Sequence, residues 1–170
     1  MRKKIAVFGS AVSGRDSAAY ARAVGVGGII AAAGYDILCG GYGGLMEAVC
    51  RGCAENGGRC YGIGLTFFTR PPNAYISRMK KVKTLGARLD YFARHADRFL
   101  ALPGGIGTIT EVMFFLDNAK IGLTRKTPLI LYGREWRALL DLMKKRFVVP
   151  PDFVKLVKIV NTGRALARSL

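Results

Sequence analysis

Short apolar runs alternate along the chain with longer segments in which apolar residues recur at helical spacing. Residues 5–8 are four apolar residues that stop at Gly9, a pattern typical of a buried strand in a parallel sheet. The helical spacing i, i+3, i+4, i+7 and i+10 is clearest at Ile109, Val112, Met113, Leu116 and Ala119. Strands are predicted at residues 5–8, 35–39, 59–65, 80–83, 99–102, 127–132 and 156–160. Helices are predicted at residues 16–33, 45–57, 87–96, 109–119, 135–146 and 163–170.

This alternation predicts an α/β fold: a Rossmann-like, doubly wound, mostly parallel sheet with helices on both faces. The length of 170 residues fits one domain, residues 1–170, and no internal repeat or linker divides it. Residues 66–77 contain Pro71-Pro72 and fit neither periodicity, which predicts a loop or lid. Within this segment, Phe67 and Phe68 either cover a bound purine or prenyl group or pack locally.

Composition narrows the class of protein. Lys and Arg number 27 against 11 Asp and Glu, a net charge of +16, yet 51% of the residues are hydrophobic, which excludes a disordered basic tail. The first apolar run is too short for a secretory signal and no segment is long enough to cross a membrane, so a cytoplasmic protein without a membrane partner is expected. Four cysteines match no common zinc or thioredoxin-like spacing, so buried thiols are expected rather than a metal or redox site.

The glycines gather in three clusters, at residues 9–14, 40–44 and 104–107, and each cluster lies between a predicted strand and a predicted helix. In open α/β sheets the carboxyl ends of the strands form the edge where ligands bind, and helix N-termini attract phosphate. A glycine after a strand is often only part of a turn. Three clusters at one edge nevertheless predict an anionic ligand, and a nucleotide is the expected one.

The sequence argues against a dinucleotide-binding protein, an ATPase and a catalytic histidine. The first loop lacks the G-x-G-x-x-G order of dinucleotide-binding proteins, and no Lys-Ser or Lys-Thr follows a glycine loop as in ATPases. His95 is the only histidine and lies in a polar helical stretch, so a surface role is expected. Glu111 lies in the first turn of the helix after the third cluster. There it either stabilises the helix N-terminus or lies beside a phosphorylated ligand.

Two of the glycine clusters resemble the signatures of a known family. Pro103 to Glu111 reads PGGIGTITE and resembles the PGGxGTxxE signature of the Lonely guy (LOG) family, long described as lysine decarboxylases. Residues 40–46 read GGYGGLM and resemble its second signature, GGGxxGLM. Residues 5–10 resemble its opening strand and Gly-Ser loop, and Arg88 resembles the arginine of the helix before the PGG strand.

The resemblance implies a Rossmann-like homodimer that cleaves the N-glycosidic bond of cytokinin riboside 5′-monophosphates, giving free base and ribose 5-phosphate. It implies catalytic roles for Arg88 and Glu111, and neither a metal nor an organic cofactor. The residues expected to bind the substrate and its phosphate are Gly9, Ser10, Gly40, Gly41, Gly43, Gly44, Gly104, Gly105, Gly107 and Thr108.

The chain departs from the family pattern at two positions. Leu89 stands where the family commonly has lysine, and Glu47 stands where it commonly has glycine. Noncatalytic proteins that bind nucleotides or carry the molybdenum cofactor share the glycine loops without the hydrolysis. Such a binding or carrier function is therefore the alternative to the enzyme.

Basic residues are concentrated in two regions, the larger at residues 78–98 and the smaller at Lys144, Lys145 and Arg146. Residues 78–98 contain seven Lys or Arg and only two acidic residues, Asp90 and Asp97. No RNA-binding aromatic signature or helix-turn-helix pattern accompanies them, which argues against nucleic acid as the partner. The charge is interpreted as a solvated surface whose field attracts phosphorylated small molecules, with a nucleoside monophosphate as the expected partner.

Overall fold

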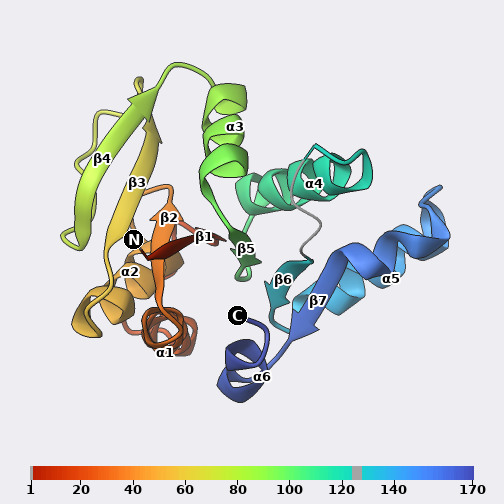
Figure 1. Ribbon diagram of the computed structural model, residues 1–170, viewed down its shortest axis with the longest axis horizontal. Helices are drawn as coiled ribbons and strands as arrows, with labels where there is room; N and C mark the ends of the chain where they lie inside the picture. Colours follow the sequence, from red (N-terminus) through yellow and green to blue (C-terminus); the bar gives the residue numbers. More distant parts are fainter. Residues whose placement is uncertain (1, 124–127) are drawn as a thin grey trace.

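Seven parallel strands form one sheet in the computed structural model, which describes residues 2–123 and 128–170 (Figure 1). The strands are β1 (Lys3–Phe8), β2 (Tyr35–Cys39), β3 (Cys60–Leu65), β4 (Ile76–Val82), β5 (Arg98–Ala101), β6 (Leu129–Tyr132) and β7 (Val157–Val160). Their order in the sheet is β4-β3-β2-β1-β5-β6-β7. The chain therefore builds outward from β1 in one direction and then resumes at β5 on its other side. In sheets of this kind, the point between β1 and β5 is where ligands bind.

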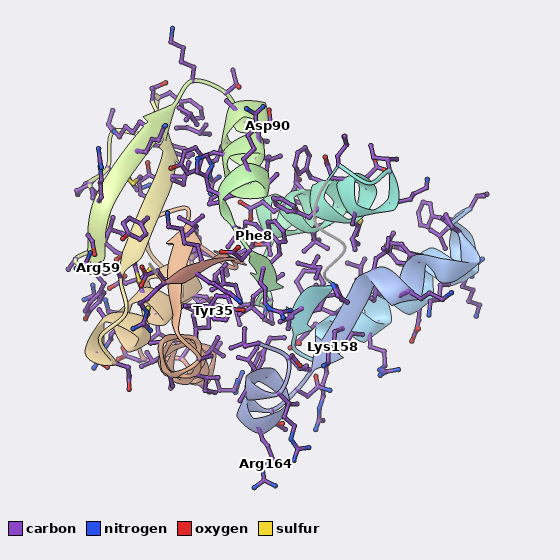
Figure 2. All side chains as sticks on the ribbon, viewed as in Figure 1. Phe8, Tyr35, Arg59, Asp90, Lys158 and Arg164 are labelled. Atoms are coloured by element: carbon purple, nitrogen blue, oxygen red, sulfur yellow. The ribbon has the colours of Figure 1, made fainter. Side chains whose placement is uncertain are left out.

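Helices cover both faces of the sheet. They are α1 (Ala18–Ala32), α2 (Leu45–Glu55), α3 (Leu85–His95), α4 (Ile106–Lys120), α5 (Glu135–Arg146), α6 (Gly163–Ala167) and the 3₁₀ helix η1 (Pro151–Leu156). Because successive strand residues point to opposite faces, β1 sends Ile5 and Val7 into a core with α1, α2 and α6. The intervening Ala6 and Phe8 enter a second core with α3, α4 and α5. Figure 2 shows Phe8 near the centre of the molecule and Arg164 at its periphery.

The predicted fold class is confirmed, and most strand and helix positions agree with the pattern of the sequence. The prediction for residues 66–77 and 80–83 is wrong in one respect: β4 begins at Ile76, inside the segment expected to be a loop. β4 is one of the two edge strands. Its less exposed positions are Ile76, Met79 and Val82, every third residue, which conceals the alternation of a strand. The last helix ends at Ala167 rather than residue 170.

Two further predictions concern the strand at residues 127–132 and the absence of a membrane-spanning segment. The strand predicted at 127–132 is found at Leu129–Tyr132, and residue 127 lies outside the described residues. Within the part of the chain that the structure describes, no helix combines the length and the apolar character needed to cross a bilayer.

Helices α1 and α2 pack backbone against backbone, and two glycines allow it. A Cβ placed on Gly52 would lie 1.9 Å from the carbonyl oxygen of Val24, and one on Gly27 would lie 2.1 Å from that of Val49. Neither oxygen belongs to a flexible side chain, so the helices would have to separate. This close contact holds the loops that precede the two helices in a fixed relation.

We expect Gly52→Ala to destabilise the protein by about 3 kcal/mol, because the added methyl group collides with main-chain atoms of α1. Gly25→Ala is the matched control, since Gly25 is an exposed residue of α1 with nothing within 4 Å of its added Cβ. That change should stabilise the helix by up to about 1 kcal/mol. Urea unfolding measures both effects, and equal midpoints for the two variants would contradict the close packing.

Candidate functional site

The three glycine clusters meet at the carboxyl edge of β2, β1 and β5. Ser10, after β1, lies between the other two loops: its N–H donates to the carbonyl of Pro103 (3.1 Å), and its own carbonyl accepts from the N–H of Leu45 (2.8 Å). Gly44 has φ of +69°, and a Cβ there would lie 2.3 Å from the Ser10 carbonyl oxygen. The backbone of the three loops is therefore in direct contact.

The predicted phosphate-binding residues divide into two groups by exposure. Gly104, Gly105 and Gly107 are exposed at the start of α4, while Ser10 and Gly43 are partly exposed. Gly105 is the N-cap of α4 and no side chain caps the helix, so backbone N–H groups of the first turn are available to an anion. The buried members of the set are Gly9, Gly40, Gly41, Gly44 and Thr108.

The buried members shape the loops. The hydroxyl of Thr108 lies against Gly104, where a Cβ would approach it to 2.1 Å. Gly40 makes room for Arg88, because a Cβ there would lie 2.6 Å from Nη2 of that arginine. In this structure, Thr108 and Gly40 thus support the loop and the arginine, and they do not present groups to solvent.

Arg88 of α3 and Glu111 of α4 form an ion pair beside these loops. Nη2 of Arg88 lies 3.3 Å from Oε1 of Glu111, and both side chains are largely buried. The Arg88 Nε–H also donates to the carbonyl of Ile63 in β3 (2.8 Å), which fixes the guanidinium. The two residues, for which the resemblance to the LOG family implies catalytic roles, lie 23 positions apart in sequence and are brought into contact by the fold.

Helices α3 and α4 both pack on the ring of Phe8, through residues one helical turn after Arg88 and Glu111. Phe8 contacts Phe92 edge-on, with ring centroids 5.4 Å apart, and stacks on Phe115 at 5.3 Å. Phe92 follows Arg88 by four residues and Phe115 follows Glu111 by four, so each pair occupies one side of its helix. The position of the ion pair is thus set by the packing around Phe8.

Burial strongly affects the carboxyl group of Glu111, which is only 7% exposed. Burial raises the pKa of Glu111 to about 7, and the nearby charge of Arg88 only partly opposes this effect. A carboxyl group with such a pKa exchanges a proton near neutral pH, as a general acid or base requires. Glu111 is the sixth residue of α4, which begins at Ile106, so the predicted position in the first turn is wrong and Glu111 does not cap the helix.

Glu47, one of the two departures from the family pattern, is also buried at this edge. Its Oε1 lies 2.5 Å from Nη2 of Arg15, which comes from the loop after β1 and is largely exposed. A Cβ on Gly43 would lie 3.9 Å from Oε2 of the same carboxylate. Glu47 thus adds a negative charge between the first two loops, paired with a cation that sequence patterns did not single out.

Residues after β3 fold back over the second loop. Asn73 donates its side-chain N–H to the carbonyl of Tyr42 (2.8 Å) and its backbone N–H to the carbonyl of Gly41 (2.9 Å). The ring of Phe68 packs edge-on against Tyr42, with centroids 5.5 Å apart, whereas Phe67 is 66% exposed. Sequence patterns did not identify Asn73, although a polar residue after Pro71-Pro72 is a turn signal that marks such a contact.

A cavity of about 320 Å³ is lined by residues that follow β1, β5 and β6, among them Leu102, Pro103 and Gly133. Its polar lining includes Arg22, Arg134 and Asn161, but neither Arg88 nor Glu111 lines it. Because Pro103 lines the cavity, the cavity adjoins the PGG loop.

The other candidate residues have simpler surroundings. His95 is exposed and its ring stacks on Tyr91, as expected of a surface residue. The four cysteines are free and buried, with Sγ of Cys39 and Cys50 3.5 Å apart. Among the described residues, no group of three or more His, Cys, Asp or Glu side chains is arranged to hold a metal ion.

The parallel sheet and the loops at its switch point define a Rossmann-like α/β protein. Residues 46–170 match the family model described as possible lysine decarboxylase. A cytokinin riboside 5′-monophosphate phosphoribohydrolase from Rhodococcoides fascians is 31% identical over 174 residues, covering 97% of this chain and 88% of that protein. One from Arabidopsis thaliana is 33% identical over 177 residues, covering 99% and 81%. The chain therefore belongs to the lysine decarboxylase-like, or LOG, family.

Solved structures share this fold. The molybdenum cofactor binding protein from Rippkaea orientalis superposes with a TM-score of 0.78 at 21% identity, covering 99% of this chain and 94% of that one. The molybdenum cofactor carrier protein from Chlamydomonas reinhardtii gives a TM-score of 0.74 at 20% identity, covering 99% and 95%. At these identities the likeness concerns the fold.

The raised pKa of Glu111 makes the stability of the protein depend on pH. The folded state binds the carboxyl proton of Glu111 more tightly than the unfolded state does. The contribution of this proton to the free energy of unfolding is therefore full below pH 4.5 and is lost as the pH rises through about 7. The loss amounts to about 3 kcal/mol. Glu111→Gln cannot ionise, so its free energy of unfolding relative to the native protein should increase between pH 5 and pH 8.

Urea unfolding at the two pH values measures this difference. Glu55→Gln is the control, because Glu55 is exposed and its pairing with Arg51 is a surface ion pair worth less than about 1 kcal/mol. An equal pH dependence for native protein and Glu111→Gln would show that Glu111 is not the group responsible.

Proposed function

We propose that the protein is a phosphoribohydrolase that cleaves the N-glycosidic bond of a nucleoside 5′-monophosphate. The observation that carries this proposal is the buried Arg88–Glu111 ion pair beside the exposed start of α4. Family membership supports it, since relatives about one-third identical are named as cytokinin riboside 5′-monophosphate phosphoribohydrolases. A cytokinin nucleotide or a related adenine nucleotide is the proposed substrate.

In the proposed complex, the phosphate binds at the N-terminus of α4, on the N–H groups near Gly105 and Gly107. This contact positions the ribose with its anomeric carbon toward Glu111. Arg88 holds the Glu111 carboxylate and offers its remaining N–H groups to the phosphate or the leaving base. Ser10 and Gly43, partly exposed on the neighbouring loops, complete the proposed ligand contacts.

The reaction requires stabilisation of positive charge on the sugar. As the C1′–N bond breaks, its electron pair leaves with the base and the ribose takes on oxocarbenium character. The Glu111 carboxylate stabilises this charge and accepts a proton from water as the water oxygen bonds to C1′. A proton then reaches the base nitrogen, so that one water molecule is consumed and free base and ribose 5-phosphate are formed.

We also propose that the working form is a homodimer, as the family resemblance implies, located in the cytoplasm. The alternative is a noncatalytic protein that binds a nucleotide or the molybdenum cofactor. The structural likeness to molybdenum cofactor binding and carrier proteins favours it, as does Glu47 in a position commonly held by glycine.

Incubation with AMP and with isopentenyladenosine 5′-monophosphate separates the two functions. The enzyme releases free base, which chromatography measures, whereas a carrier binds and releases nothing. Glu111→Gln should lose roughly a hundredfold or more in turnover while still binding AMP, because the amide cannot accept the proton from water. Glu55→Gln should keep full turnover. Full turnover by Glu111→Gln would overturn the proposed role, and AMP binding without base release by the native protein would favour the carrier.

The pH dependence of the reaction provides an independent measurement. Because Glu111 acts as the carboxylate and its pKa is raised to about 7, kcat/KM should rise with pH up to about 7 and level off above it. A rate already constant from pH 5 upward would assign catalysis to a different group.

A further inference from the structure

We propose that a basic hollow between β4 and α3 is a second anion-binding site, which takes a small ligand carrying two or more linked phosphate groups. The basic hollow is defined by Lys4, Tyr61, Arg78, Lys80 and Tyr91 and has a volume of about 500 Å³. Pockets for small ligands typically measure on the order of 300–1,000 Å³. The inference is independent of the proposed hydrolysis.

No residue of the three glycine clusters lines the hollow. Its floor is formed by β1 to β4 on the face that α3 covers, and Tyr91 of α3 forms a wall. In Figure 1, β4 and α3 are joined at the upper end of the sheet. Lys4, Tyr61 and Arg78 belong to the first halves of their strands, whereas the glycine loops follow the last residues of theirs. Arg88 lies close by, because its Nε–H donates to the carbonyl of Ile63, which lines the hollow, but neither Arg88 nor Glu111 is among the lining residues.

The register of the edge strand directs two cations into the hollow. Arg78 pairs with Tyr61 and Lys80 pairs with Ile63, and all four residues line it. Neighbouring residues in a strand point to opposite faces. Met79, between the two cations, accordingly extends toward the other face, where its Sδ approaches Gly41 and Gly62. Arg78 and Lys80 are therefore on the same face as α3.

Aromatic rings fix the positions of the lysines. Nζ of Lys80 lies 4.7 Å from the ring centroid of Tyr91, and Nζ of Lys4 lies 5.4 Å from that of Tyr61. Such cation–π contacts hold an ammonium group in place without removing its charge. The ring of His95 also stacks on Tyr91, at 3.9 Å. Because protein groups already occupy these rings, the hollow suits phosphate better than stacked bases.

The charge of the hollow is not balanced by its own lining. None of its lining residues is acidic. The ion pairs Arg2–Asp36, Arg15–Glu47, Arg51–Glu55 and Arg88–Glu111 of the described residues include neither Arg78 nor Lys80. Asp97 lies near Lys4, and its carboxylate accepts the backbone N–H of that residue (2.9 Å). A bound anion would relieve the repulsion between cations held in one hollow.

The spacing of the cations indicates the size of the ligand. Lys4 on β1 and Arg78 on β4 are three strand positions apart, about 14 Å at the level of the backbone. Lys80 lies two residues further along β4, about 7 Å from Arg78. A single phosphate is small compared with this span, so linked phosphates can contact more of the cations at once. The expected ligand is therefore an oligophosphate, either free or as part of a nucleotide.

Calorimetric titration of inorganic tripolyphosphate at about 0.15 M salt tests the proposal. The native protein should bind it more tightly than orthophosphate. The double variant Arg78→Gln with Lys80→Gln should weaken binding roughly tenfold or more, because two charge-assisted contacts are lost. The matched control is Lys81→Gln with Lys83→Gln. It removes the same charge at residues that do not line the hollow, and should change affinity less than about threefold. Thermal unfolding checks that both variants are folded.

Three results would overturn the proposal: no binding by the native protein, equal weakening in both double variants, or no preference for tripolyphosphate over orthophosphate. ATP and a dT oligonucleotide serve as further probes. Binding of ATP with the same sensitivity to Arg78 and Lys80 supports a nucleotide as the source of the phosphates. An oligonucleotide that binds more tightly than tripolyphosphate, and loses affinity only in the hollow variant, would show a nucleic-acid groove instead.

Discussion

The ring of Phe8, at the last position of β1, stacks on Phe115 of α4 and meets Phe92 of α3 edge-on. This aromatic contact joins the central strand to the two helices that carry the ion pair, Arg88 and Glu111. Because each charged residue precedes its phenylalanine by four positions, the distance between the charges follows from the packing of the rings. Close packing in a protein interior transmits small changes. The geometry of the candidate site is consequently a property of the core.

The same core determines the electrostatics of the site. Glu111 lies where burial favours its neutral form, while Arg88 favours its ionised form, and burial has the larger effect. The carboxyl group is therefore held near the point at which it gains or loses a proton at neutral pH. An arginine suits this role because it keeps its charge when buried, whereas a buried lysine loses its proton more readily. Ionising a buried carboxyl group lowers folding stability, as is common for strained or buried groups at functional sites.

The sequence predicted the fold class and the meeting of the three loops because these depend on local patterns. Apolar runs mark buried strands, and glycines mark the turns at their carboxyl ends. The role of Glu111 could not be decided in this way, since its partner Arg88 is 23 positions away and the contact is tertiary. The resemblance to a family implied catalytic roles for both residues, and the structure shows that they form an ion pair. The contact between Glu47 and Arg15 joins α2 to the first loop and likewise has no signal in periodicity.

The edge of the sheet was less predictable for a physical reason. The register between β3 and β4 shifts between Cys60 and Tyr61, and that irregularity decides which β4 side chains face α3. Alternation along the sequence cannot locate such a shift. The placement of Arg78 and Lys80 over one hollow therefore required the structure, although the excess of positive charge in residues 78–98 was evident from composition.

The absence of a side chain at Gly40 limits which substitutions the protein can accept during evolution. The guanidinium of Arg88 occupies the space into which a side chain at position 40 would grow. A mutation at Gly40 would therefore act on Arg88 before it acted on any ligand. A Cβ at position 40 would also lie 2.8 Å from Sδ of Met46, so descendants of this chain gain freedom at the end of β2 only if both neighbours change. A lineage that keeps Arg88 is therefore expected to keep Gly40 as well.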